Sequence, residues 1–278
     1  MVLFAAPAVL SADSVDEAIA LYNKQDFAGA CANLKILVAN EPQNPRAWHY
    51  LGMSTLFAGG PDAIDQALPA MEQAAKLARE DSEILENYGE VAIEYASRHT
   101  SIPAALRGRD ALESCLKLDP NNLRAREVLY NFYTQAPWPI GSRSKANAQL
   151  DQIRQRDQTR AQLILINAKI QAKAYPEAFA QCDEFLQKYP HEPLVLIQYG
   201  FAAVLSGLNS ERGLACLQGV VTLDSYPKNA PAPTNAWHWI GNLQERLGHR
   251  DEARTAYQRA LELDPKNKWA QEGLARVK

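Results

Sequence analysis

Residues 236–265 read AWHWIGNLQERLGHRDEARTAYQRALELDP, and the spacing of their residue types indicates the fold. Small, aromatic and proline residues stand in it at the spacing of two amphipathic helices joined by a tight turn. Glycine and alanine lie where two helical backbones cross closely, an aromatic ring fills the space beside them, and a proline ends the second helix. These positions are Trp237, Gly241, Gly248, Ala253, Tyr257, Ala260 and Pro265. The stretch therefore predicts a helical hairpin.

The hairpin resembles the tetratricopeptide repeat, whose period is about 34 residues. The same template fits upstream segments, several of which also end at a proline, as LKLDP does at Pro120. The resemblance implies an all-α, right-handed superhelix of about seven helix pairs, because one pair cannot bury its apolar face alone. The expected repeats are residues 11–44, 45–81, 82–122, 123–158, 159–192, 193–225 and 234–267, with a capping helix at 268–278, so that the solenoid covers 13–278.

The composition excludes some functions and leaves the compartment open. The net charge of −3 argues against a dedicated nucleic-acid binder, which needs a clustered cationic surface. The four cysteines are widely spaced and the five histidines show no ligand spacing, so we expect neither a metal nor another cofactor. No catalytic motif and no apolar run long enough for a transmembrane helix is present. We therefore expect a protein that is not an enzyme.

The first twelve residues, MVLFAAPAVLSA, form an apolar run that ends in small residues. This pattern is typical of the later part of a secretory signal, although the basic start is missing. The alternative is an apolar cap that docks on the first helix. A signal would place the protein in the periplasm or outside the cell, and a cap would be compatible with the cytoplasm.

The resemblance also indicates where a partner would bind. In this family the first helix of each pair lines a concave groove, through positions two before and one, five and nine after the signature tryptophan. In the third repeat these positions form a stripe of four carboxylates on one helix face. They are Glu83, Glu86, Glu90 and Glu94. Like charges at this spacing cost the helix about 1 kcal/mol, unless cations offset them.

Two sources of that positive charge are open. Arg46, His49 or Arg124 on neighbouring repeats could supply it, or a basic partner could. His49 and His238 follow the signature tryptophans of their repeats, which predicts that both lie on first helices and face inward.

Asparagine recurs at the position five after the tryptophan, as Asn131, Asn167 and Asn242. A side-chain amide both donates and accepts hydrogen bonds, which suits contact with the backbone of an extended peptide. The resemblance implies this role, and ordinary surface polarity is the alternative.

One irregular stretch, QAPWPIGSRSKA at 135–146, is interpreted as an enlarged turn between the helices of the fourth repeat. Trp138 at its tip either folds back over the repeat or stands exposed as a contact. The cations that follow lie either on a solvated helix face or against anionic lipid or nucleic acid. They are Arg143, Lys145, Arg154, Arg156 and Arg160.

These observations predict a non-catalytic scaffold that binds a peptide or a partner protein in its concave groove, with the glutamate stripe favouring a basic or mixed-charge ligand. The alternative is a periplasmic accessory component of a solute transport system. It rests on a weaker similarity of the proline-glycine turn to the soluble T-component of TRAP-type transporters.

Overall fold

The computed structural model describes residues 14–228 and 230–277, and within them every regular element is a helix. This confirms the all-α repeat fold. The predicted leader or cap at residues 1–12 lies outside the described residues. The chain divides into two compact units, residues 1–152 (unit 1) and 153–278 (unit 2), each of which is described by itself.

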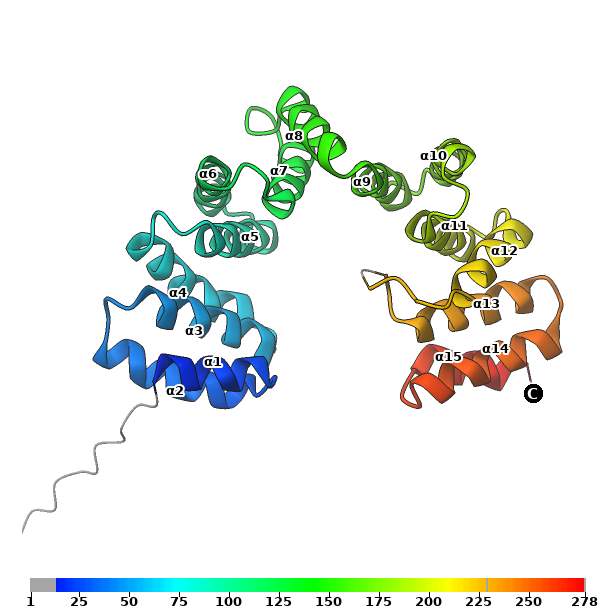
Figure 1. Cartoon of the computed structure of the whole chain (residues 1–278), viewed down its shortest axis with the longest axis horizontal. Coiled ribbons are helices and arrows are strands. Elements are labelled where there is room, and N and C mark those ends of the chain that lie inside the picture. The colour runs from blue at the N-terminus through cyan, green and yellow to red at the C-terminus, as the bar shows by residue number, and fades with distance from the viewer. Residues whose placement is uncertain (1–13, 229, 278) are drawn as a thin grey trace, which may run out of the picture. The chain divides into compact units, whose positions relative to one another are not determined.

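Unit 1 contains three complete helix pairs and most of a fourth. Its helices are α1 (Val15–Asn23), α2 (Phe27–Asn40), α3 (Pro45–Ala58), α4 (Ala63–Leu77), α5 (Ser82–His99), α6 (Ile102–Leu118), α7 (Leu123–Gln135) and α8 (Arg143–Arg156), of which α8 continues past the boundary between the units. Figure 1 shows these helices from blue at α1 to green at α8.

Unit 2 contains three further pairs and a terminal helix. Its helices are α9 (Gln158–Gln171), α10 (Tyr175–Lys188), α11 (Pro193–Ser206), α12 (Ser210–Val221), α13 (Pro233–Arg246), α14 (Arg250–Leu263) and α15 (Lys268–Arg276). None of the described helices combines the length and the apolar character that crossing a membrane requires.

The same cap starts three of these helices. The side chains of Asn44, Asn122 and Asn267 each accept a hydrogen bond from the backbone amide three residues later, at 3.2, 2.8 and 3.0 Å. Such a cap satisfies one of the amides that the first turn leaves free and is worth about 1 kcal/mol. Each asparagine comes directly after the turn that follows a second helix: Asn44 and Asn122 begin a new helix pair, and Asn267 begins the terminal helix α15.

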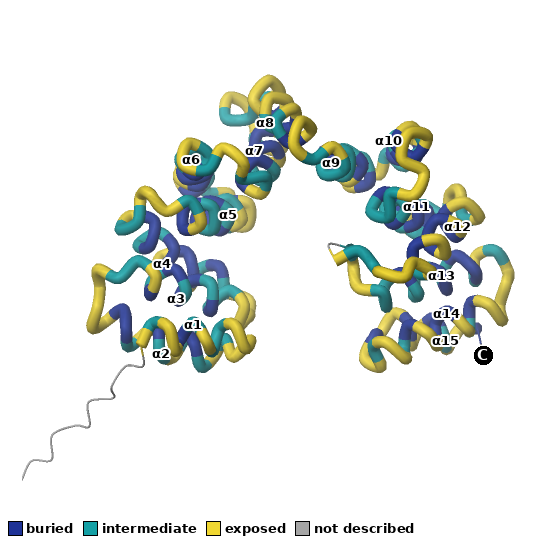
Figure 2. The backbone as a smooth tube through the Cα atoms, in the orientation of Figure 1, coloured by how far each residue is buried: buried dark blue, intermediate teal, exposed yellow. Residues whose placement is uncertain are grey.

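Glycines lie where the two helices of a pair cross, as the spacing predicts. A Cβ atom added to Gly89 of α5 would lie 2.9 Å from the carbonyl oxygen of Gly108 on α6, and one added to Gly200 of α11 would lie 2.3 Å from Leu217 of α12. The backbones therefore approach too closely for a side chain. Figure 2 shows buried residues concentrated along the facing sides of the helices.

The irregular stretch after α7 is a short loop, in agreement with the interpretation as an enlarged turn. Its tryptophan, Trp138, is 89% exposed, which decides for the exposed alternative and against folding back over the repeat. The hydroxyl of Ser142 accepts a hydrogen bond from the amide of Lys145 at 3.3 Å and so caps α8.

Candidate functional site

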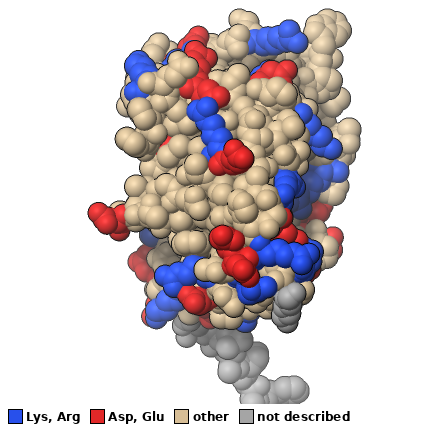
Figure 3. Space-filling model, turned by 90° about the vertical axis from the view of Figure 1, so that its right-hand side faces the viewer, with Lys and Arg blue, Asp and Glu red and all other residues tan. Residues whose placement is uncertain are grey.

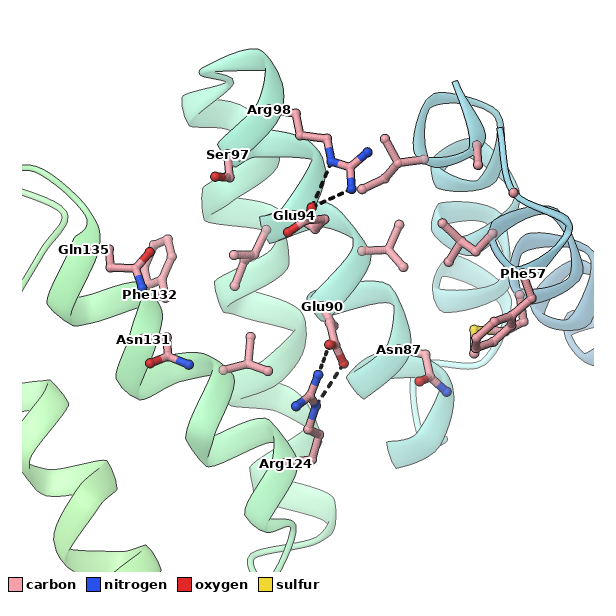
Figure 4. A pocket seen from close by; sticks show the side chains of 18 of the residues that line it. Phe57, Asn87, Glu90, Glu94, Ser97, Arg98, Arg124, Asn131, Phe132 and Gln135 are labelled. Atoms are coloured by element: carbon pink, nitrogen blue, oxygen red, sulfur yellow. Dashed lines mark hydrogen bonds and ion pairs between the residues drawn. The ribbon is translucent and has the colours of Figure 1, made fainter. Parts of the chain in front are cut away.

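A groove of about 850 Å³ in unit 1 is lined mainly by the first helices of three successive repeats, α3, α5 and α7 (Figure 4). Because the second helices α4 and α6 pack against these first helices, the other side of α3, α5 and α7 is left to form a shared surface.

The apolar part of the groove comes from all three helices. It includes Met53, Leu56, Phe57, Ile64, Val91, Ile93, Val128 and Phe132, of which Ile64 belongs to the first turn of α4. The most accessible of the larger side chains is Phe57, which is 55% exposed. Its ring stacks on Phe27 at 5.3 Å and meets Tyr22 edge-on at 5.9 Å, so the exposed face is held in a fixed position.

The charged part of the groove is paired. Glu90 of α5 forms an ion pair with Arg124 of α7, and Glu94 lies 2.8 Å from Arg98 one turn further along α5. Figure 4 shows both pairs beside the apolar surface. Of the cations expected to offset the glutamate stripe, Arg124 therefore does so. Two carboxylates and two guanidinium groups leave the groove itself without net charge.

The rest of the predicted stripe lies outside the groove. Glu86 accepts a hydrogen bond from the side-chain amide of Asn122, the cap of α7, so it supports the packing of α7 on α5. Glu83 is exposed in the first turn of α5, where its backbone amide is bound by Asp81 at 3.0 Å. The four glutamates share a helix face as predicted, but only two of them line the groove.

The structure corrects the roles expected for Arg46 and His49. Arg46 pairs with Asp16 of α1 at 3.1 Å. His49 is only 4% exposed, and its Nε2 lies 3.1 Å from the side-chain nitrogen of Asn87. Burial lowers the pKa of His49, against a smaller opposing effect of Asp81. A buried, neutral imidazole can neither offset the glutamates nor touch a partner, so His49 joins α3 to α5.

Of the three predicted asparagines, Asn131 of α7 is exposed in the groove, on the same helix as Arg124. Asn167 and Asn242 belong to unit 2, on α9 and α13. Asn167 is exposed, and Asn242 lies beside Arg246 and Arg276 in a shallow cavity of about 350 Å³. The structure thus brings Asn131 together with Glu90 and Glu94.

His238 is half-buried in unit 2. Its ring lies 6.2 Å from Tyr257 and stacks on Trp269 of α15 at the same distance. Burial lowers the pKa of His238, and the positive charge of Arg276 lowers it further. The histidine is therefore held neutral between two aromatic rings. One of these rings, that of Trp269, is itself 65% exposed.

Sequence reasoning missed the apolar half of the groove, although the signal was present. Met53 and Phe57 stand five and nine residues after Trp48, which are the same positions that indicated the asparagines and glutamates. Both line the groove, and Phe57 is 55% exposed there.

Within the described residues, no cluster of histidines, cysteines and carboxylates has the arrangement of a metal site. The cysteines have free thiols, and burial raises the pKa of Cys115 and Cys216 to about 11 and that of Cys182 to about 12. These three thiols are protonated at neutral pH and pack as small apolar side chains. On the face drawn in Figure 3, cationic and acidic side chains are interspersed.

A repeated helix pair whose first helices line a groove defines the class of helical-repeat proteins. The family model described as Tetratricopeptide repeat matches residues 234–267. A comparison with curated proteins gives no match. The last pair of the chain is therefore a tetratricopeptide repeat by its sequence as well as by its structure.

Solved structures of the same class resemble nearly the whole chain. One is a tetratricopeptide repeat protein from Parabacteroides merdae ATCC 43184, with 17% identity over 95% of this chain and 96% of that one, and a TM-score of 0.57. Another is yeast Tom70, with 15% identity, 99% of this chain covered and a TM-score of 0.64; the match spans 58% of the Tom70 chain. The fold is that of a tetratricopeptide-repeat protein.

Proposed function

We propose that the protein is a non-catalytic scaffold that binds a peptide or a helix of another protein in the groove of unit 1. The observation that carries this proposal is the open groove of about 850 Å³, in which a fixed, exposed Phe57 adjoins two ion pairs and Asn131. Aromatic surface supplies binding free energy, and polar groups beside it fix the position of the bound chain.

The charges of the groove favour an amphipathic ligand of mixed charge over a strongly basic one. Glu90 and Glu94 already have cationic partners inside the protein, so a basic ligand would gain little from them without breaking those pairs. A basic side chain would find the exposed Glu83 at the beginning of α5 instead. An apolar side chain would bury the open face of Phe57, at about 25 cal/mol for each Å² removed from water.

Site-specific photocrosslinking tests the groove. A benzophenone amino acid at Asn131, which lines the groove, is compared with the same amino acid at Asn147, an exposed asparagine of α8 that does not line it. A native partner should be crosslinked from position 131 and not from position 147. Equal crosslinking from both positions, or from 147 alone, would place the partner on another surface.

Export is part of the same proposal, and it rests on the signal-like character of residues 1–12. Cell fractionation with an antibody against the native protein tests it: recovery with the periplasmic or secreted fraction supports export, and recovery with the cytoplasm favours the alternative.

A further inference from the structure

The loop between α7 and α8 is the most exposed apolar feature of the described residues. Trp138 is 89% exposed, more than any other large hydrophobic side chain among the described residues; the next is Trp269, at 65%. The loop stands out beside α8 in Figure 1. It lies outside the groove, so partner binding there does not use it.

The backbone of the loop satisfies its own hydrogen bonds. The amides of Ile140 and Gly141 both donate to the carbonyl of Pro137, at 2.9 and 3.0 Å, and the amide of Ser142 donates to the carbonyl of Tyr133 at 2.9 Å. The two prolines of the loop have no amide hydrogen to satisfy. The tip therefore offers few backbone donors that would lose water on entering a less polar medium.

The loop is also closed tightly. A Cβ atom added to Gly141 would lie 2.0 Å from the carbonyl oxygen of Ala136, so the two ends of the loop are in contact. A closed loop holds the indole of Trp138 outward without a large loss of conformational freedom on binding.

Cations stand directly behind the tip. Arg143 and Lys145 are exposed in the first turn of α8, and the sequence has no aspartate or glutamate from Val128 to Leu150. Glu113 of α6 lies 4.0 Å from the Lys145 nitrogen and also accepts a hydrogen bond from the hydroxyl of Tyr133. Because Lys145 is 57% exposed, it remains accessible to an anion.

We propose that this loop docks on an anionic membrane surface, with the Trp138 indole at the level of the headgroups and with Arg143 and Lys145 against lipid phosphates. Tryptophan favours this interfacial region because its ring is apolar and its N–H stays hydrated. The ring protrudes from a loop whose backbone groups bond to each other, so it can enter a bilayer without a matching cavity. A protein partner would have to supply a pocket for it. The cations add attraction to an anionic leaflet of about 1 kcal/mol each.

Sedimentation with lipid vesicles tests this proposal on the full chain. The probes are vesicles of equal parts phosphatidylglycerol and phosphatidylcholine, with pure phosphatidylcholine vesicles for comparison. We expect binding to the anionic vesicles, weakening as salt is raised. Trp138→Ala should abolish most of this binding, and Arg143→Ala and Lys145→Ala should each lower the partition coefficient about fivefold, the factor for about 1 kcal/mol.

Trp269→Ala is the matched control, because it removes the other strongly exposed indole and leaves the loop intact. It should bind the anionic vesicles like the wild type. Since Trp138 is almost fully exposed, its loss should leave the circular dichroism spectrum and the melting temperature unchanged.

Three outcomes would overturn the proposal: no binding to anionic vesicles, equal loss in the Trp138 and Trp269 variants, or equal binding to both vesicle types. A fourth outcome would also overturn it: the wild-type protein does not bind vesicles, and Trp138→Ala loses the crosslink to the native partner. The loop would then contact a protein and not a membrane. The groove is tested by separate variants, so either proposal can fail alone.

Discussion

Arg124 of α7 and Glu90 of α5 form an ion pair across the groove of unit 1, with the Arg124 Nε atom 3.1 Å from Glu90 Oε2 and a second contact from its terminal nitrogen to Oε1. The pair joins two consecutive repeats, and the hydrogen bond to Glu90 raises the pKa of Arg124. It neutralises the middle of the glutamate stripe. A ligand therefore meets a locally neutral surface at this point.

Reversing one charge of this pair should weaken partner capture. Glu90→Lys places a second cation beside Arg124, which should repel basic side chains of a mixed-charge ligand. Arg124→Glu places a second carboxylate beside Glu90, which should repel acidic ones. The stability change should be only about 0.2–1 kcal/mol, because both side chains are more than a third exposed. Capture of the crosslinked partner and urea unfolding measure the two effects.

The double variant Glu90→Lys, Arg124→Glu is the control for this prediction. It restores a neutral pair with the opposite orientation, so it should recover the stability and most of the capture. If stability recovers and capture does not, binding depends on which of the two helices carries the positive charge. If all three variants captured the partner as well as the wild type, the ion pair would not take part in binding.

Gly108 should not tolerate even a methyl group. Its Cβ atom would lie 2.8 Å from the carbonyl oxygen of Gly89 and 2.9 Å from the Ile93 side chain. We expect Gly108→Ala to destabilise unit 1 by about 1–3 kcal/mol, because the close crossing of α5 and α6 would have to open. The free energy of unfolding, measured by urea titration, checks this value.

Gly219 of α12 provides the matched comparison, because nothing lies within 4 Å of an added Cβ atom there. Gly219→Ala should stabilise the protein by up to about 1 kcal/mol, through the better helix propensity of alanine. If both alanine variants stabilised the chain, the close crossing at Gly108 would be wrong.

Tyr257 links the last repeat to its capping helix. It is fully buried, and its hydroxyl donates to Glu245 at 2.9 Å, while Arg276 of α15 holds the same carboxylate at 2.8 and 2.9 Å. Tyr257→Phe should cost about 1.5–3 kcal/mol, the range for a hydrogen bond to a charged group. Tyr189→Phe, which removes a more exposed hydroxyl, should cost less, and the reverse order would contradict this account.

Most of the fold could be predicted from the sequence because repeats are built from local signals. One 30-residue stretch indicates both where the two helices of a pair cross, through Gly241 and Tyr257, and where the pair ends, at Pro265. The same pattern recurs upstream. The first helices and their inward positions follow from this register. For this reason the inward position of Glu90, Glu94 and Asn131 could be predicted from the sequence, and all three line the groove.

The details that were missed depend on contacts between repeats. The burial of His49 follows from its contact with Asn87, 38 residues away, which the periodicity of one helix cannot reveal. The pairing of Glu90 with Arg124 was one of several open alternatives for the same reason. The direction of Trp138 depends on how its loop closes, and repeat spacing says nothing about an enlarged turn.

The burial of His49 predicts a loss of stability on acidification. Because the pKa of His49 is lowered in the folded protein from 6.5, the unfolded chain binds its proton more readily. Stability is therefore complete above about pH 6.5 and falls as the pH drops toward the lowered folded value. The loss is about 1.4 kcal/mol for each pH unit between the two pKa values. Urea unfolding at about pH 5.5 and about pH 7.5 measures it.

Substitution of the histidine separates this effect from others. His49→Gln should reduce the difference between the two pH values, and adding His238→Gln should reduce it further, because burial lowers the pKa of His238 as well. Glu245 does not interfere: Arg276 lowers its pKa, so its contribution is lost only as the pH falls below its ordinary value of 4.5. His191→Gln, at an exposed position, is the control. A pH dependence that survives both buried substitutions unchanged would show that other groups cause it.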